Sequence, residues 1–196
     1  MLDKLKKNKD IINIKEVDNL IELECDKNNI LPVLKKLKEN DNFIFDQLLD
    51  ITAVDNPSRE CRFDLVYIIQ SLKKNKKLIL KTSLKENDTI ETIISVHKAA
   101  DWYERECYDL FGIEFKNHPD LRRIMTDYNF EGHPLRKDFP LTGHTEVRYD
   151  DLEKKVIYEP VKLSQEFRDF DSESPWEGMK NNLIGDETVS YTHLTL

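Results

Sequence analysis

The chain has 196 residues, and its 38 acidic residues outnumber its 30 basic ones, for a formal net charge of −8. This balance argues against a nucleic-acid binder that works by releasing phosphate counterions. No apolar stretch approaches the ~20 residues needed to span a bilayer, and the N-terminal Met1–Lys7 has no apolar signal core. We therefore expect a protein that is neither exported nor membrane-spanning and that works in the compartment where it is made.

Cofactor motifs are missing from the sequence. Its three cysteines, at positions 25, 61 and 107, are too dispersed for a disulfide framework and too few for a four-thiolate iron–sulfur cluster. Its five glycines are too scattered for a phosphate-binding loop or a dinucleotide fingerprint. We expect no flavin, nucleotide, cluster or metal bound by this chain.

Residues 1–115 have the pattern of an α+β domain, a compact mixed sheet with helices. The predicted elements begin with a strand in 10–17, a helix after Asn29 through Leu31, Leu34 and Leu37, and, in 43–54, either a strand or a short helix followed by a strand in 48–54. They continue with strands in 61–72, 78–84 and 89–96, a helix in 99–111 ended by Gly112, and a short extended piece in 113–115. The helix in 99–111 has an apolar stripe formed by Ala99, Tyr103, Cys107 and Leu110/Phe111. Glu104, Arg105, Glu106 and Asp109 are expected to lie largely off that stripe.

The rest of the chain is divided into a signature loop region (116–143), an extended partner-binding arm (144–180) and a tail (181–196) that is expected to be disordered or extraneous. Residues 101–196 hold 21 acidic and 12 basic side chains, and six of the twelve are Arg, which is preferred at interfaces. The arm is acidic but carries widely spaced aromatics, which favours a strap on a partner surface over a disordered acidic tail. The expected anchors of the arm are Phe167, Arg168, Phe170 and Trp176.

The stretch from Trp102 to Gly143 is the densest in candidate functional residues. His118, His133 and Asp127 could be read as metal ligands of a hydrolase, but no ligand pair is spaced to share a helix face and both histidines precede proline. Glu104 and Glu106 point apart on a helix, so they cannot form an acid–base pair. We expect Glu104 to pair with Arg122, Arg123 or a neighbour's Arg105, in a buried ion-pair network that fixes the helix to the following loop rather than as a catalytic carboxylate. We expect Cys107 to be a core residue.

This same stretch closely resembles the signature of the 30-kDa subunit family of respiratory complex I, which is the C-type subunit of bacterial NADH–quinone oxidoreductase. The signature residues, which are also the expected interface residues, are Glu104, Arg105, Glu106, Asp109, Phe111, Gly112, His118, Pro119, Asp120, Arg122, Arg123, Asp127, Arg136, Lys137, Asp138, Phe139 and Pro140. The resemblance covers about residues 10–180.

The resemblance implies a scaffolding subunit of the peripheral arm with no catalytic, cofactor-binding or metal residues of its own. Its partners would be the 49-kDa-type quinone-site subunit, the 20-kDa-type cluster subunit and other peripheral-arm subunits, without nucleic acid. The FMN and iron–sulfur clusters would lie in partner subunits, with NADH and quinone as substrates of the complex. The expected location is the cytoplasmic face of the bacterial inner membrane, or the mitochondrial matrix side if the gene is organellar.

Two alternatives remain open at this point. One is the equivalent subunit of a related membrane-bound hydrogenase-type complex. The other, from a different class, is a stand-alone metallohydrolase that would use His118, His133 and Asp127.

Overall fold

The computed structural model describes residues 11–17 and 20–165. These residues fall into two compact units, the first ending at His144 and the second beginning at Thr145. The elements are strands β1 (Ile11–Val17) and β2 (Leu20–Cys25), the 3-10 helix η1 (Lys27–Asn29), helix α2 (Ile30–Glu39), strands β3 (Gln47–Asp55), β4 (Phe63–Ser71), β5 (Lys76–Leu84) and β6 (Thr89–Glu91), helix α3 (Ala100–Phe111), and strands β7 (Glu114–Lys116), β8 (Thr145–Asp150) and β9 (Lys155–Pro160). None of the helices in the described ranges is both long and apolar enough to cross a membrane.

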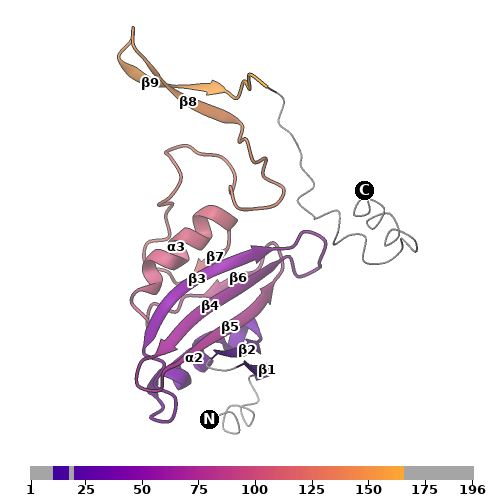
Figure 1. Ribbon diagram of the computed structural model, residues 1–196, viewed down its shortest axis with the longest axis vertical. Coiled ribbons are helices and arrows are strands. Elements are labelled where there is room, and N and C mark those ends of the chain that lie inside the picture. Colours follow the sequence, from indigo (N-terminus) through magenta and orange to yellow (C-terminus); the bar gives the residue numbers. More distant parts are fainter. Residues whose placement is uncertain (1–10, 18–19, 166–196) are drawn as a thin grey trace, which may run out of the picture. The chain divides into compact units, whose positions relative to one another are not determined.

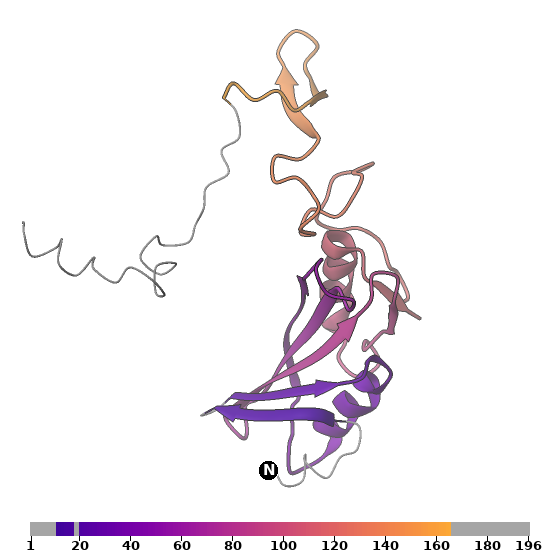
Figure 2. The same ribbon diagram turned by 90° about the vertical axis from the view of Figure 1, so that its right-hand side faces the viewer.

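A mixed sheet forms the centre of the first unit, with strand order β1-β2-β5-β4-β3 in the described residues (Figure 1). Strands β2 and β5 are parallel, and the other neighbours are antiparallel. Side chains of β4 alternate strictly between buried and half-buried positions, as expected for a strand with one face in the core. Helices α2 and α3 lie on the same face of this sheet (Figures 1 and 2). The predicted α+β class with a mixed sheet is confirmed.

Helix α2 follows the predicted apolar spacing, because Ile30, Val33, Leu34 and Leu37 are its buried residues. Asparagine is a preferred N-cap residue, so the sequence also predicts that Asn29 caps this helix. Asn29 occupies the N-cap position without a side-chain cap hydrogen bond, whereas the Asp26 side chain accepts from the Asn28 amide at 2.9 Å in the preceding turn.

Helix α3 ends where predicted, at Gly112, whose φ of 78° is left-handed and whose N–H donates to the Tyr108 carbonyl. The charged side chains of this helix do not form a solvent-exposed face. Glu104, Arg105 and Asp109 are buried, at 0%, 6% and 0% exposure. The charged face of α3 is therefore an interior face, covered by the loops on either side of the helix in sequence.

The predicted strand in 89–96 is shorter in the structure, since β6 ends at Glu91. At this point the chain turns, and the Ile93 amide donates to the buried carboxylate of Glu104 at 2.8 Å instead of continuing a ladder. Strand β6 pairs in parallel with β7, which matches the extended piece predicted after α3.

The second unit contains a hairpin of β8 and β9, where the sequence indicated no regular element. Its pairs Val147–Tyr158 and Tyr149–Val156 place four apolar side chains on one face, each 53–58% exposed. The opposite face carries the Arg148–Glu159 ion pair at 2.6 Å. The predicted anchors Phe167, Arg168, Phe170 and Trp176 lie outside the described residues.

Candidate functional site

The signature residues gather around the C-terminal half of α3. The segment from Asn117 to Gly143, here called the signature segment, contains no helix or strand. Its backbone groups therefore need partners other than a ladder, and the residues that supply them define the candidate site.

The first of these residues is Asp109, a fully buried carboxylate on α3. It accepts hydrogen bonds from the amides of Ile124, Met125 and Thr126 at 3.1, 2.7 and 2.9 Å, and from the Thr126 hydroxyl at 2.7 Å. The Arg123 guanidinium adds an ion pair at 3.1 Å. Burial alone would raise the pKa of Asp109, but the hydrogen bonds from Thr126, Met125 and Ile124 outweigh it and lower the pKa. Asp109 thus holds the loop as an anion.

The signature segment also caps the C-terminus of α3. The last four carbonyls of a helix have no partner within the helix, yet all four of these are satisfied. Their donors are the Gly112 amide for Tyr108 at 2.9 Å, the His133 ring for Asp109 at 2.8 Å, the Leu135 amide for Leu110 at 3.1 Å and the Arg136 side chain for Phe111 at 2.6 Å. The Arg136 cation is also favourable at this negative end of the helix dipole.

Close packing makes glycine necessary at the end of this helix. A Cβ on Gly112 would lie 2.6 Å from both the Arg136 guanidinium and the His133 ring. The cap therefore depends on the absence of a side chain at Gly112 as well as on its left-handed backbone.

A second attachment joins the segment to the end of the sheet. Arg62 forms a two-point ion pair with the buried Asp55, at 2.8 and 3.0 Å, and a further pair with Asp138 at 2.9 Å. The Lys137 amide donates to Asp55 at 2.7 Å. The hydrogen bond from Arg62 is the main cause that lowers the pKa of Asp55. Glu86 accepts from Arg62 at 2.9 Å and so extends the network.

Sequence reasoning did not identify Asp55, Arg62 or Glu86 as part of the site. The available signal was Arg62 itself, one of two arginines among the 18 basic residues of the first hundred. An arginine in a lysine-rich half is typical of a buried or bidentate pair.

Glu104 is buried without an arginine partner among the described residues, contrary to the expected pairing with Arg122 or Arg123. Its carboxyl accepts from the Thr92 hydroxyl at 2.6 Å and the Ile93 amide at 2.8 Å. The His118 ring lies 3.8 Å away. Burial raises the pKa of Glu104 to about 7. Glu104 joins α3 to the chain after β6, whereas Asp109 is the residue that receives Arg123.

His118 has both ring nitrogens engaged. Its Nδ1 accepts from the Asp120 amide at 3.1 Å, so Nε2 is the nitrogen that can donate, to the Asp101 carbonyl at 3.3 Å. The His133 ring bonds to Asp109, eight residues further along α3 than Asp101, which is about 12 Å along a helix axis.

The structure therefore does not bring His118 and His133 together, and Asp127 is exposed. Within the described residues, no three or more His, Cys, Asp or Glu side chains are grouped to hold a metal ion. The ligand set considered for a metallohydrolase is not assembled there.

Cys107 is a core residue, as predicted. Its thiol lies 3.2 Å from the Ile51 carbonyl, and burial raises its pKa well above the ordinary value. A buried thiol of this kind is a poor nucleophile.

The remaining signature residues lie on the surface or pack along the segment. Arg122 and Asp120 form an exposed ion pair at 2.9 Å. Phe139 packs against Phe130, with ring centroids 5.8 Å apart, and its ring would also meet a Cβ added at Gly132. Glu106 and Phe111 flank the buried face of α3, as a half-buried and a buried residue, while Pro119 and Pro140 are exposed.

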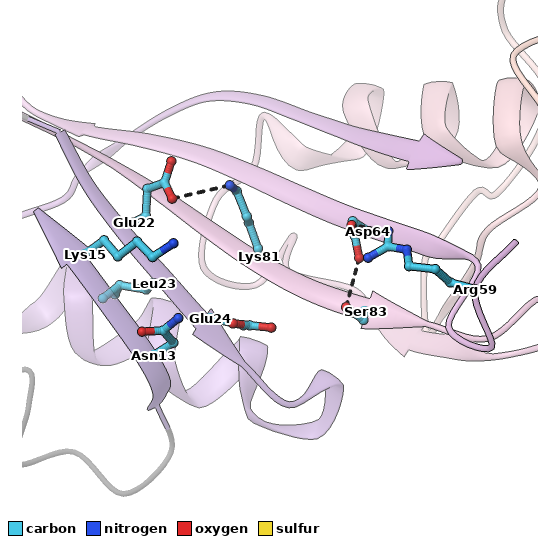
Figure 3. A pocket seen from close by; sticks show the side chains of 9 residues that line it. All are labelled: Asn13, Lys15, Glu22, Leu23, Glu24, Arg59, Asp64, Lys81 and Ser83. Carbon is cyan, nitrogen blue, oxygen red and sulfur yellow. Dashed lines mark hydrogen bonds and ion pairs between the residues drawn. The ribbon is translucent and has the colours of Figure 1, made fainter. Parts of the chain in front are cut away.

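A polar hollow of about 170 Å³ lies on the sheet face opposite the helices (Figure 3). Four of its charged side chains form two pairs: Lys81 with Glu22 at 3.5 Å, and Arg59 with Asp64 at 2.5 Å. None of the signature residues lines it. We regard the signature segment, not this hollow, as the candidate site.

The fold and this site define an α+β domain that holds an irregular segment rigidly on one helix. The chain belongs to the family of the respiratory-chain NADH dehydrogenase 30 Kd subunit, whose model matches residues 23–145.

The curated relatives carry a corresponding name, the C-type subunit of NADH-quinone oxidoreductase. The protein of Cereibacter sphaeroides is 53% identical over 160 residues, which is 82% of this chain and 80% of that protein. Its counterpart in Ruegeria sp. is 54% identical over 159 residues, covering 81% of this chain and 79% of that protein.

A solved structure is similar at lower identity. It is a chain of the membrane-bound sulfane sulfur reductase, an archaeal respiratory membrane complex, with a TM-score of 0.62 and 27% identity over 71% of this chain and 83% of that one.

Proposed function

We propose that this chain is a peripheral-arm subunit of proton-pumping NADH–quinone oxidoreductase that binds no cofactor and acts as a scaffold for the quinone-reduction module. One observation carries the proposal. The two buried carboxylates of the signature, Asp109 and Glu104, are used to hold backbone segments. Such an arrangement makes a rigid surface for docking and not a reaction centre.

The proposed partners are the 49-kDa-type quinone-site subunit and the 20-kDa-type cluster subunit. FMN and the iron–sulfur clusters would belong to partner subunits, and NADH and quinone would be substrates of the whole complex. The names of the relatives support membership of such an enzyme. The proposed location is the cytoplasmic face of a bacterial inner membrane, or the matrix side in an organelle.

The arm is proposed to add a second contact with the partner. The hairpin face that contains Val147, Tyr149 and Val156 is exposed apolar surface. An isolated two-stranded hairpin is marginally stable in water, so burial against a partner would stabilise it. Interface cores are enriched in such aromatic side chains.

The similarity to the sulfane sulfur reductase chain supports a second candidate, the equivalent subunit of a hydrogenase-type membrane complex. The two proposals predict different co-purified subunits. The NADH-type enzyme requires an FMN-containing, NADH-oxidising module, which the hydrogenase-type complex would not contain.

The experiment is affinity purification of the tagged full chain from its own membranes in mild detergent, with identification of the bound proteins. We expect quinone-site and cluster subunits together with an NADH-oxidising module. Recovery of the first two without that module would favour the hydrogenase-type complex. A chain recovered alone, with activity on a substrate of its own, would contradict the scaffold proposal.

A further inference from the structure

Arg105 is a buried arginine without a carboxylate partner in the described residues. It is 6% exposed. Its Nε donates to the Arg122 carbonyl at 3.3 Å, and its guanidinium lies 5.2 Å from the Trp102 ring centroid. These contacts fix the direction of the side chain but provide no countercharge.

Arg105 differs in this respect from the other arginines that the structure describes. Each of them pairs with a carboxylate: Arg59 with Asp64, Arg62 with Asp55, Arg122 with Asp120, Arg123 with Asp109, Arg136 with Glu86 and Arg148 with Glu159. A desolvated cation is costly unless it is paired. The most buried arginine of the signature is thus the one whose pair is incomplete.

Its neighbour Trp102 is 63% exposed, although it is a large aromatic residue. Tryptophan and arginine are the side chains most enriched at the energetic centres of protein interfaces. A guanidinium held against an aromatic face keeps its remaining N–H groups in a fixed fork that suits a carboxylate.

The charges around Arg105 restrict the kind of anion. Asp101 and Glu106 lie on the same helix, and Asp120 of the adjoining loop is paired with Arg122 at 2.9 Å. A single carboxylate directed at the guanidinium adds less negative charge beside these acids than a polyanion or an anionic membrane surface would.

We propose that Arg105 and Trp102 form a receptor for one Asp or Glu side chain of a neighbouring subunit. The inference rests on the proposed function and adds to it the point of attachment and the chemistry of the partner. Helix α3 then contributes the cation of an ion pair whose carboxylate is supplied only in the assembled complex.

The test uses Arg105→Lys in the assembled complex, treated with a water-soluble carbodiimide. The reagent activates a carboxyl group, the new amine attacks it, and an amide forms while the carbodiimide leaves as a urea. We expect a cross-link between position 105 and an acidic residue of another subunit, identified by mass spectrometry. The matched control is Arg59→Lys, whose partner Asp64 is in the same chain, so only an internal cross-link is expected.

A second pair of measurements separates an interface role from a structural one. Arg105→Gln should lower the amount of assembled complex on the order of tenfold, while the unfolding midpoint of the isolated chain stays within about 2 °C of the parent. Arg123→Gln, which breaks an internal pair with Asp109, should lower that midpoint clearly.

The proposal is overturned if the amine at position 105 is coupled only to acids of its own chain, or if Arg105→Gln destabilises the isolated chain as much as Arg123→Gln does. The proposal is also overturned if Arg105→Gln leaves the amount of assembled complex unchanged. Arg105-dependent sedimentation with phosphatidylglycerol vesicles would instead indicate a membrane headgroup. If the parent chain is not in the complex at all, the proposed function fails, which is a separate result.

Discussion

Asp109 and Glu104 are both fully buried on helix α3, but their surroundings stabilise opposite charge states. Three backbone amides, a hydroxyl and Arg123 surround Asp109 and lower its pKa. Glu104 has two hydrogen-bond donors and no arginine or lysine paired with it in the described residues, and burial raises its pKa. The role of Asp109 is therefore tested by the loss of stability in a variant, and that of Glu104 by how stability depends on pH.

Asp109→Asn should loosen the signature segment. The amide side chain has one acceptor oxygen in place of two, so buried donors of the 124–126 turn lose their partner. We expect a loss of about 3 kcal/mol or more in the free energy of unfolding, measured by urea denaturation. Limited proteolysis should show faster cleavage between residues 117 and 143. Asp120→Asn is the control, since its pair with Arg122 is exposed and should cost less than about 1 kcal/mol.

Glu104→Gln should change how stability depends on pH. The folded pKa of about 7 exceeds the ordinary 4.5, so the folded state binds the extra proton between these values. The contribution of Glu104 to the free energy of unfolding is fully present below about pH 4.5 and is lost as pH rises through 7. The shift corresponds to on the order of 3 kcal/mol.

His97 makes the free energy of unfolding depend on pH in the opposite sense, over an overlapping pH range. Burial and the nearby Lys38 lower its pKa to about 4, so its contribution to stability is lost as pH falls. The quantity to measure is therefore the difference in unfolding free energy between Glu104→Gln and the parent at pH 5 and at pH 8. We expect the unfolding free energy of the variant to increase relative to that of the parent as pH rises. A difference that does not vary with pH would show that Glu104 ionises normally.

At the scale of elements, the end of α3 is closely constrained by the residues that cap it. Gly112→Ala should cost about 1–2 kcal/mol for the left-handed backbone, plus the displacement of Arg136 and His133, which lie 2.6 Å from the added carbon. Gly143→Ala is a matched control for the backbone cost, because Gly143 also has a left-handed φ, of 70°. Thermal unfolding of both variants compares the two costs; equal losses would mean that the cap tolerates a side chain.

The sequence allowed most elements to be predicted, since hydrophobic period and turn residues act locally. The strands in 48–54, 61–72 and 78–84 and the Gly112 stop all correspond to observed elements. The buried charged face of α3 could not be predicted from its period, because Glu104 and Asp109 are compensated by donors at residues 92–93 and 123–126. The sequence pattern of a helix identifies its polar face but does not identify the loop that covers that face.

The candidate site was predictable as a set of residues but not as a network. The histidines and acids of the signature were identified together, yet several of their partners come from strand β3, from the turn before β4 and from the loop after β5. The Lys137 amide, for example, bonds to Asp55, which is 82 positions earlier. Only the fold reveals such long-range pairs, since neither spacing nor composition links the two positions.

At the scale of the whole molecule, the two units have different sources of stability. The first unit has a buried apolar core and the network that fastens the signature segment, both formed within residues 1–144. The hairpin of the second unit has one charged and one apolar exposed face, and none of its described residues belongs to that core. Stability of the first unit and attachment to a partner should therefore be separable.

A chain truncated after His144 should test this separation. It retains the ties from Asp109, Arg136 and Asp55 to the signature segment, so we expect an unfolding midpoint within about 3 °C of the full chain. Incorporation into the complex should fall strongly, because the arm with its exposed Tyr149 is missing. Quantification of subunits in the purified complex measures incorporation, with the full chain expressed at the same level as control. A truncated chain that assembles normally would show that the first unit alone carries the docking surface, and one that fails to fold would show that the arm is part of the domain.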